Sequence, residues 1–232
     1  MVIGDSMKKV LFSDFDRTLF VEDEEVLDKN IAAINKFMKD NIFVIITGRT
    51  YKSVKRVLDL YNIKYNYLIC MNGAEIYEGD KLLLKICLHK EDVDIIKDII
   101  AKHHLDYSVD DFDDEKFADK EVSSVFIRRN EKLTYDAILE TRTRTNTYNY
   151  LSPHWFNIVN GKVNKASAVE ELKKIIGGDL KIYTIGDAVN DLEMIKNYNG
   201  VVMKDHEMSL DGLNLSEYEG LYQYIDKIIK ED

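Results

Sequence analysis

The sequence predicts an α/β fold, a doubly wound parallel sheet with a small α+β module inserted between its two halves. Residues 1–78 alternate apolar runs with amphipathic helix patterns, and residues 161–232 resume the same alternation. This rhythm is typical of a parallel sheet that is covered by helices on both faces. Residues 79–160 read instead as several strands and two helices, so we expect them to form a separate module.

The first half of the chain predicts three strands with two helices between them. Apolar runs mark strands at Lys9–Phe15, Ile42–Ile46 and Tyr67–Met71. The unbroken run of the second strand indicates an inner strand covered on both faces, and Asn72-Gly73 closes the third with a turn. Apolar residues spaced three and four apart predict the helices. Their inward faces carry Leu27, Ile31, Ile34 and Met38 in the first helix and Val54, Val57, Leu58 and Tyr61 in the second.

The end of the chain continues this pattern. Strands are predicted at Lys181–Ile185 and Gly200–Met203, with a short helix at Asp191–Asn197 between them. A longer helix precedes the first of these strands and is stopped by Gly177-Gly178, and another helix closes the chain. Their apolar faces carry Ala168, Val169, Leu172, Ile175 and Ile176 in the earlier helix and Leu221, Ile225, Ile228 and Ile229 in the later one.

The inserted segment has a different composition of elements. Helix patterns cover Glu91–His103 and Lys132–Thr141. The strand-like runs are LLLKICL, EVSSVFIRR, NTYNYL and WFNIV. We therefore expect one domain built from residues 1–78 and 161–232, and a second built from residues 79–160.

Charge and composition restrict the class of partner. The formal net charge is −10 and the isoelectric point is about 5.1, so the long-range field repels nucleic acid and anionic membranes. A phosphorylated metabolite is repelled as well and would need a metal ion or a well-placed lysine. No apolar run reaches the roughly 20 residues that span a bilayer, and the first nine residues lack a secretory apolar stretch. Cys70 and Cys87 show no metal-ligand spacing. We expect a cytoplasmic monomer or small homo-oligomer.

Polar residues gather where predicted strands end, which is the edge at which parallel sheets bind ligands. Asp14 and Asp16 end the first strand, and acids two residues apart on extended backbone point the same way. They can hold a hard cation or act as nucleophile and acid/base, although an isolated pair is more often a solvated turn. Thr47 and Gly48 follow the second strand, where a hydroxyl and free N–H groups before a helix make an anion site.

Two further signals come from the second half of the chain. Lys165 begins the helix after NGKVN, a position at which lysine is usually a surface residue. Asp187, Asn190 and Asp191 follow the strand Lys181–Ile185, and acids that open a helix are favoured by its dipole. Each signal alone can be explained by an ordinary structural role. The acid pair, hydroxyl, lysine and second acid pair in this order are far more specific together.

In this order of groups the sequence resembles the haloacid dehalogenase-like (HAD) superfamily of phosphohydrolases. The four motifs of that family correspond to Asp14/Asp16/Thr18, Thr47, Lys165 and Asp187/Asp191. The inserted module fits the family's type-2 cap on a Rossmann-like core. Asn72-Gly73-Ala74 and GDAVND look like the Cof-type sugar-phosphate phosphatases. Two departures are visible, Arg17 where the family often has Gly, and Met203-Lys204-Asp205-His206 where it usually has Met-Gly-Asn-Ala.

The resemblance implies a magnesium-dependent phosphatase that hydrolyses a small phosphorylated metabolite, such as a sugar phosphate. Asp14 would attack the phosphorus and form an aspartyl-phosphate, while Asp16 would act first as acid and then as base. Phosphate and substrate would be bound by Thr47, Gly48, Lys165 and Asn190. Mg²⁺ would be held by Asp14, the Asp16 backbone carbonyl, Asp187 and Asp191, the last being either a ligand or a partner of Lys165.

Three other functions stay open. A phosphomutase on the same scaffold would return the phosphoryl group to a sugar, and a phospho-aspartate signalling domain would keep it. A non-catalytic binding module is disfavoured because every motif group is present. Within the inserted module, an arginine could read an acidic group on the substrate, although most are expected to be surface charges. Those arginines are Arg128, Arg129, Arg142 and Arg144, and we expect Tyr148 and Trp155 to pack in the module's own core.

Overall fold

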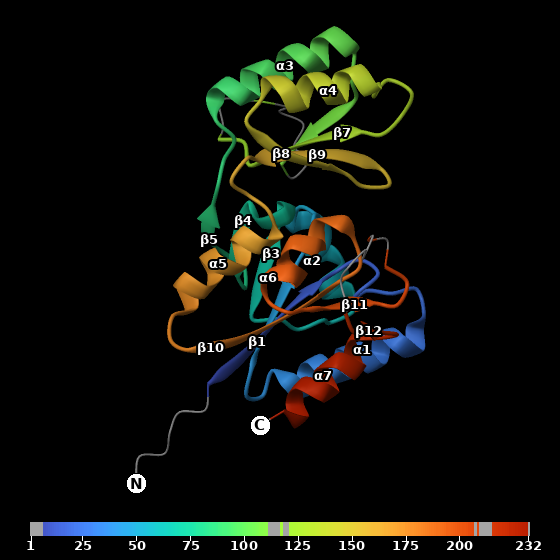
Figure 1. Ribbon diagram of the computed structural model, residues 1–232, viewed down its shortest axis with the longest axis vertical. Helices are drawn as coiled ribbons and strands as arrows, with labels where there is room; N and C mark the ends of the chain where they lie inside the picture. Colours follow the sequence, from blue (N-terminus) through green and yellow to red (C-terminus); the bar gives the residue numbers. More distant parts are fainter. Residues whose placement is uncertain (1–6, 111–116, 118–120, 207, 209–214, 232) are drawn as a thin grey trace.

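An eight-stranded sheet forms the larger part of the molecule (Figure 1). The computed structural model describes residues 7–110, 117, 121–206, 208 and 215–231. Six neighbouring strands of the sheet are parallel, and two antiparallel strands extend one edge. In spatial order the strands are β12 (Glu217–Tyr218), β11 (Val201–Met203), β10 (Leu180–Gly186), β1 (Lys8–Asp14), β2 (Ile42–Ile46), β3 (Tyr67–Cys70), β4 (Glu75–Glu78) and β5 (Lys81–Lys85).

Helices cover both faces of this sheet, as the sequence predicts for a doubly wound fold. Alternate residues of β1 face opposite ways, so Leu11 joins one apolar cluster while Val10 and Phe12 join the other. The first cluster lies under α1 (Glu24–Phe37), α2 (Tyr51–Leu60) and α7 (Leu221–Lys230), and the second under α5 (Lys165–Ile176) and α6 (Leu192–Asn197). The α/β prediction is confirmed.

The strand order places a topological switch point beside β1. From this central strand the chain moves outward through β2 and β3 on one side, and later through β10, β11 and β12 on the other. Helices that follow β1 and β10 therefore leave in opposite directions and open a crevice at the carboxyl ends of the two strands. Open α/β sheets bind ligands at such a crevice.

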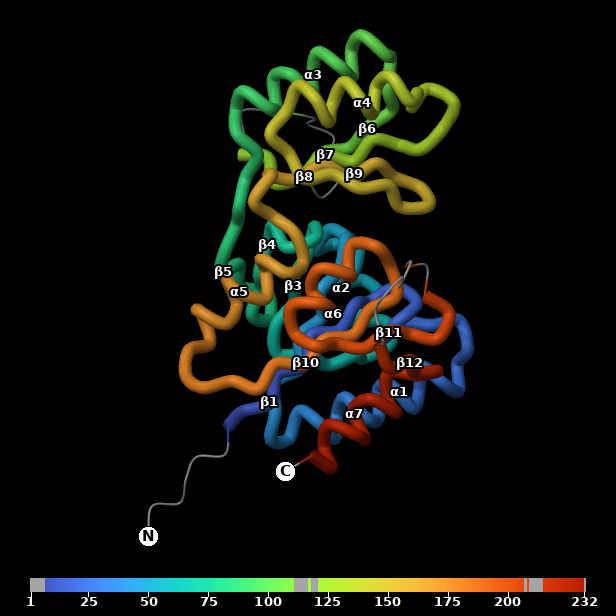
Figure 2. Tube along the Cα trace, viewed as in Figure 1, coloured from blue at the N-terminus to red at the C-terminus, as the bar shows by residue number. Residues whose placement is uncertain are grey.

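A smaller antiparallel sheet lies at the other end of the molecule. Its strands, in spatial order, are β6 (Tyr107–Val109), β7 (Ser124–Arg128), β9 (Trp155–Asn160) and β8 (Thr147–Leu151). Helices α3 (Lys90–His103) and α4 (Tyr135–Arg144) cover the face that points away from the large sheet (Figure 1). Figure 2 traces the chain from β5 into this module and back from β9 to α5. The uncovered face of the small sheet thus meets the large domain.

One strand lies outside the inserted module to which the sequence assigns it. The run LLLKICL was expected there, but β5 (Lys81–Lys85) pairs antiparallel with β4 in the large sheet. Gly79 has φ +58° and closes a tight hairpin between the two strands. The chain therefore completes this hairpin within the large sheet before it enters the inserted module. The expected boundary at residue 79 falls inside the hairpin.

Two sequence expectations concern membranes and export. Within the described part of the chain, no helix combines the length and the apolar character needed to cross a bilayer. Most of the N-terminal segment inspected for a secretory signal, residues 1–6, lies outside the described residues.

Candidate active site

Three buried aspartates converge at the switch point. Asp14 is the last residue of β1, and Asp187 directly follows β10. Asp191 ends a 3₁₀ turn, Val189–Asp191, and directly precedes α6. One carboxylate oxygen from each aspartate lies within 4.8 Å of the others. The parallel pairing of β1 with β10 brings together acids that are more than 170 residues apart in the sequence.

Lys165 lies among these carboxylates. As the first residue of α5, it is held in place by an Asn164 side chain that caps the helix and accepts from the Ser167 N–H. Its ammonium donates to Asp14 Oδ1 at 2.5 Å and to Asp191 Oδ1 at 2.6 Å. A lysine that is 1% exposed is stable only with such partners. The surface-lysine interpretation of this position is therefore wrong.

Burial determines the protonation behaviour of the cluster. Desolvation raises the pKa of Asp14 well above its ordinary value, although Lys165 opposes the shift. Desolvation and the neighbouring Asp191 carboxylate raise the pKa of Asp187 to about 6. Burial alone would lower the pKa of the Lys165 ammonium, but Asp14 and Asp191 raise it above the ordinary value. The lysine remains charged, while the carboxylates lack sufficient positive charge around them.

A divalent cation fits this donor set. Among the described residues, the centre holds three buried carboxylates against one buried ammonium. Burial and the neighbouring Asp191 carboxylate both disfavour the charged form of Asp187, and a hard cation bound by carboxylate oxygens would stabilise that form. Both oxygens of Asp191 have partners within the protein, since Oδ1 accepts from Lys165 and Oδ2 accepts from the Asp187 and Ala188 N–H groups.

The Asp16 side chain does not belong to the cluster of three buried acids. Its carboxylate is half exposed and receives both arms of the Arg49 guanidinium, at 2.9 Å from Nε and 2.5 Å from Nη2. The guanidinium also lies 5.2 Å from the centroid of the Phe15 ring. A bidentate fork fixes the orientation of the carboxylate more firmly than a single contact does. Asp16 is therefore held at the mouth of the site, next to but not inside the acidic cluster.

A loop after β2 supplies donors beside Asp14. The β1–β2 register aligns Asp14 with Ile46, so Thr47 lies one residue beyond it on the adjacent strand. The Thr47 hydroxyl accepts from the Arg49 N–H at 3.1 Å and keeps its own proton to donate. Gly48 follows and has no side chain of its own. This arrangement can bind the oxygens of an anion placed next to Asp14.

Asn190 joins the last motif to this loop. Its amide donates to Asn72 Oδ1 at 2.9 Å, and the Asn72 N–H donates to the Thr47 carbonyl at 2.9 Å. Asn72 has φ +57° and Gly73 has φ +114°, so the turn predicted from these two residues places an amide side chain over the site. The direct partner of Asn190 in the structure is therefore the turn, which lines the site.

The two departures from the resembled family lie side by side. Arg17 has φ +62°, a left-handed conformation that favours glycine. Its guanidinium donates to the Asp205 carbonyl at 2.8 Å and approaches Asp187 Oδ2 at 3.3 Å. The half-exposed Arg17 thus joins the loop containing Asp205 to one of the clustered acids.

The small sheet presents aromatic side chains to the large domain. Tyr148 and Trp155 pack against an apolar cluster that continues from the large domain into the small sheet through Phe126 and Val159. Phe156 and Ile158 lie on the opposite face and fill the core between the small sheet and its helices. The expectation that Tyr148 and Trp155 belong to the module core is wrong, because strand alternation gives them the opposite face. Three of the module's four named arginines have local partners. Arg142 donates to Asn149, Arg144 pairs with Glu140 and Arg129 donates to the Ser152 carbonyl.

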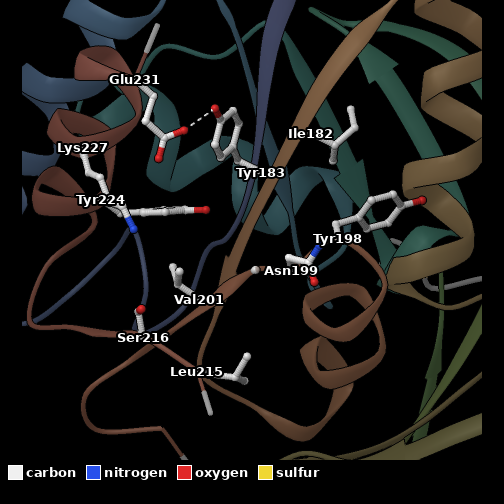
Figure 3. A pocket seen from close by; sticks show the side chains of 11 residues that line it. Ile182, Tyr183, Tyr198, Asn199, Val201, Leu215, Ser216, Tyr224, Lys227 and Glu231 are labelled. Carbon is white, nitrogen blue, oxygen red and sulfur yellow. Dashed lines mark hydrogen bonds between the residues drawn. The ribbon is translucent and has the colours of Figure 1, made fainter. Parts of the chain in front are cut away.

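A cavity of about 390 Å³ lies elsewhere, between β10, β11 and α7 (Figure 3). Tyr183, Tyr198 and Tyr224 line it, and the Tyr183 hydroxyl donates to Glu231. None of the eight predicted site residues borders this cavity. The chemistry-bearing groups therefore gather at the switch point rather than in this cavity.

Sequence reasoning missed four contributors to the site. Arg49 and Arg17 occur in the motifs but gave no sign of their acidic partners. Asn72 was interpreted as a turn and as part of the family resemblance, with no role assigned to its side chain. Tyr150 gave no sequence signal, because its approach to the large domain depends on how the module docks.

The fold and the site define a hydrolase with an acidic, lysine-containing centre at the switch point of an α/β sheet. A family model for haloacid dehalogenase-like hydrolases matches residues 11–137 and 107–211. The chain belongs to this family, and phosphatase-named relatives support a phosphatase. The family prediction made from the motifs is confirmed.

Relatives and solved structures agree with that placement. The chain is 24% identical over 208 residues to the 5-amino-6-(5-phospho-D-ribitylamino)uracil phosphatase YcsE of Bacillus subtilis, covering 84% of this chain and 83% of the relative. It is 28% identical to an uncharacterised protein of Mycoplasma capricolum, with coverage of 91% and 96%.

Solved structures share the fold. A haloacid dehalogenase-like hydrolase from B. subtilis superposes with a TM-score of 0.79 at 16% identity, covering 94% of this chain and 98% of the other. A HAD subclass IIB sugar phosphatase gives 0.76 at 18% identity, with coverage of 95% and 99%.

Proposed function

We propose that this chain is a magnesium-dependent phosphatase that hydrolyses a small phosphomonoester through an aspartyl-phosphate on Asp14. The observation that carries the proposal is the Lys165 ammonium, which is bonded to Asp14 and Asp191 inside a cluster of three buried carboxylates. A structural ion pair does not need a third buried acid, whereas a site for a phosphoryl group and a cation does.

The first chemical step transfers the phosphoryl group to Asp14. An Asp14 oxygen forms a bond to phosphorus while the ester P–O bond breaks, and Asp16 gives its proton to the leaving oxygen. In the second step a water oxygen attacks the phosphorus of the acyl phosphate and Asp16 takes the proton of that water. Phosphate leaves and Asp14 is regenerated. Asp16 is half exposed beside the site, and the Arg49 fork would have to release its carboxylate before it carries the proton that the first step needs.

The developing charge is met by donors that are already in place. The Thr47 hydroxyl, the Gly48 N–H and the Lys165 ammonium would hold the equatorial phosphoryl oxygens. Asp14, Asp187 and Asp191 carry the carboxylates that would hold Mg²⁺, with the Asp16 backbone carbonyl as a further oxygen. A bound Mg²⁺ supplies charge neutralisation for the attacking carboxylate and the phosphoryl oxygens.

We further propose that the module between β5 and α5 acts as a cap that selects the leaving group. Its uncovered sheet face meets the large domain above the site. The ribitylaminouracil phosphate in the name of the B. subtilis relative and sugar phosphates are suitable members of a substrate panel. A cytoplasmic location and a monomer or small homo-oligomer stay predictions from the sequence.

The test is release of phosphate from p-nitrophenyl phosphate and from that panel, with Mg²⁺ and with excess chelator. We expect turnover that needs Mg²⁺ and disappears in chelator. A bisphosphate requirement would indicate the phosphomutase instead. Full activity in chelator would contradict the metal assignment, and no activity on any ester with Mg²⁺ would contradict the proposed function.

A further inference from the structure

A tyrosine of the inserted module reaches the anion-binding loop of the large domain. Tyr150 lies on β8, on the face of the small sheet that meets the large domain, and its hydroxyl accepts a hydrogen bond from the Asn72 amide. A Cβ atom added to Gly48 would lie 2.5 Å from that hydroxyl oxygen. The Tyr150 hydroxyl therefore lies directly against the residue whose N–H is expected to bind phosphate.

The hydroxyl still has a proton to donate. A phenol offers one O–H donor besides its acceptor capacity. The Asn72 amide uses the acceptor side, because it donates to the Tyr150 oxygen while its own carbonyl accepts from Asn190. No acceptor for the Tyr150 proton occurs in the part of the chain that the structure describes. The Tyr150 hydroxyl proton, which lies beside Gly48, is thus available to donate to an oxygen of a bound ligand.

The surroundings keep this group protonated and orient it. Burial raises the pKa of the Tyr150 phenol above its ordinary value, so it acts as a donor at neutral pH. Asn72 is itself fixed by its N–H bond to the Thr47 carbonyl. The chain Asn190–Asn72–Tyr150 thus runs from the last motif, across the anion loop, into the module.

We propose that the Tyr150 hydroxyl donates a hydrogen bond to a non-bridging oxygen of the phosphoryl group bound by Thr47, Gly48 and Lys165. Tyr150 is then a substrate-binding residue contributed by the cap. This inference rests on the proposed function, because it requires a phosphoryl group beside Gly48.

Tyr150→Phe removes the hydroxyl and keeps the packed ring. With Mg²⁺ present, we expect the Kd for inorganic phosphate, measured by titration calorimetry, to rise on the order of 10-fold to 100-fold, as for loss of a hydrogen bond to a charged group. The value of kcat/KM on p-nitrophenyl phosphate should fall by a similar factor. Tyr148→Phe is the matched control, because Tyr148 lies two residues earlier on the same strand face. The Kd of this variant for phosphate should be unchanged.

A double-mutant cycle tests the contact itself. Gly48→Ala places a methyl group against the Tyr150 hydroxyl and should weaken phosphate binding in the parent protein. In the Tyr150→Phe background the hydroxyl is gone, so the same methyl group should cost less. The effects of the two substitutions on the Kd for phosphate should therefore be non-additive. Additive effects would overturn the proposed contact.

Four other outcomes also decide the matter. An unchanged phosphate Kd in folded Tyr150→Phe, with an active parent, overturns the inference and leaves the phosphatase standing. A loss of kcat/KM with unchanged phosphate affinity moves the contact to the leaving group and also overturns it. Equal losses in Tyr148→Phe and Tyr150→Phe would show a general disturbance of the cap and would overturn the specific role of the Tyr150 hydroxyl. An inactive parent that binds no phosphate would contradict the proposed function itself.

Discussion

Two ion pairs flank the carboxyl end of β1, and they differ in burial. Lys165 and Asp14 lie inside the protein and are 1% and 6% exposed. Arg49 and Asp16 lie at the mouth of the site, with roughly a third and a half of their side chains exposed. The buried pair has no water to replace a lost partner, whereas the outer pair does. We infer that the first is built for fixed positions and the second for exchange of protons with substrate and water.

The largest expected effects separate the two aspartates. Asp14→Asn replaces the proposed nucleophile and should abolish turnover and the phosphoenzyme. Asp16→Asn should slow both steps by roughly 10²–10⁴-fold, the range of general acid–base catalysis. With p-nitrophenyl phosphate, whose leaving group needs little protonation, the first step should be spared more than the second. Quenched-flow measurements should then show a burst from Asp16→Asn.

Folding of both variants is checked by circular dichroism. A burst from Asp14→Asn, with none from Asp16→Asn or the parent, would exchange the two roles. Such a result would place the nucleophile at the exposed mouth and remove the functional contrast between the pairs.

Removing the cation from each pair compares their energetics. Lys165→Gln leaves buried carboxylates without their partner, so we expect a loss of about 3–5 kcal/mol in unfolding free energy for the metal-free protein. Arg49→Gln breaks an exposed pair and should cost at most about 1 kcal/mol. Urea unfolding with and without Mg²⁺ measures both changes, and Mg²⁺ should restore part of the loss for Lys165→Gln.

Activity provides a second contrast between these variants. Lys165→Gln should lower kcat on the order of 10²–10³-fold, because a preorganised charge at the transition state is lost. Lys162→Gln is the matched control, since this exposed lysine lies three residues earlier. Equal stability losses for Lys165→Gln and Arg49→Gln would contradict the distinction by burial, and normal turnover of Lys165→Gln would make that lysine purely structural.

The sequence predicted the buried centre better than its mouth. Asp14 and Asp187 could be located because apolar runs mark strands, and parallel strands bring their carboxyl ends to one edge. Lys165 followed from its place at the start of a helix within the motif order. The Arg49–Asp16 fork depends on side-chain rotamers across two loops, which no sequence spacing determines.

Docking of the module was the second limit. Alternation along β8 and β9 separates Tyr148 and Trp155 from Phe156, but alternation alone does not tell which face meets the other domain. The β5 strand was misplaced for a related reason, because a hairpin around Gly79 and a module boundary produce similar local patterns. Contacts between domains are therefore where sequence reasoning failed.

The smallest expected effect concerns an ion-pair network on the cap surface, far less buried than Lys165. Hydrogen bonds from Lys102, His103 and Arg144 lower the pKa of Glu140 to about 2, below its ordinary value of 4.5. Because the folded-state pKa is the lower one, the network stabilises the protein above about pH 4.5. That stabilisation declines as the pH falls toward 2.

Glu140→Gln removes the titrating group and tests this pH dependence. At pH 7 the parent should melt at a slightly higher temperature than Glu140→Gln, and the difference should shrink between pH 5 and pH 3. Thermal unfolding of both proteins across this range, in low salt and in ~1 M salt, measures the change, since exposed pairs are screened by salt. A melting-temperature difference that is constant with pH would show that Glu140 acts through packing rather than charge.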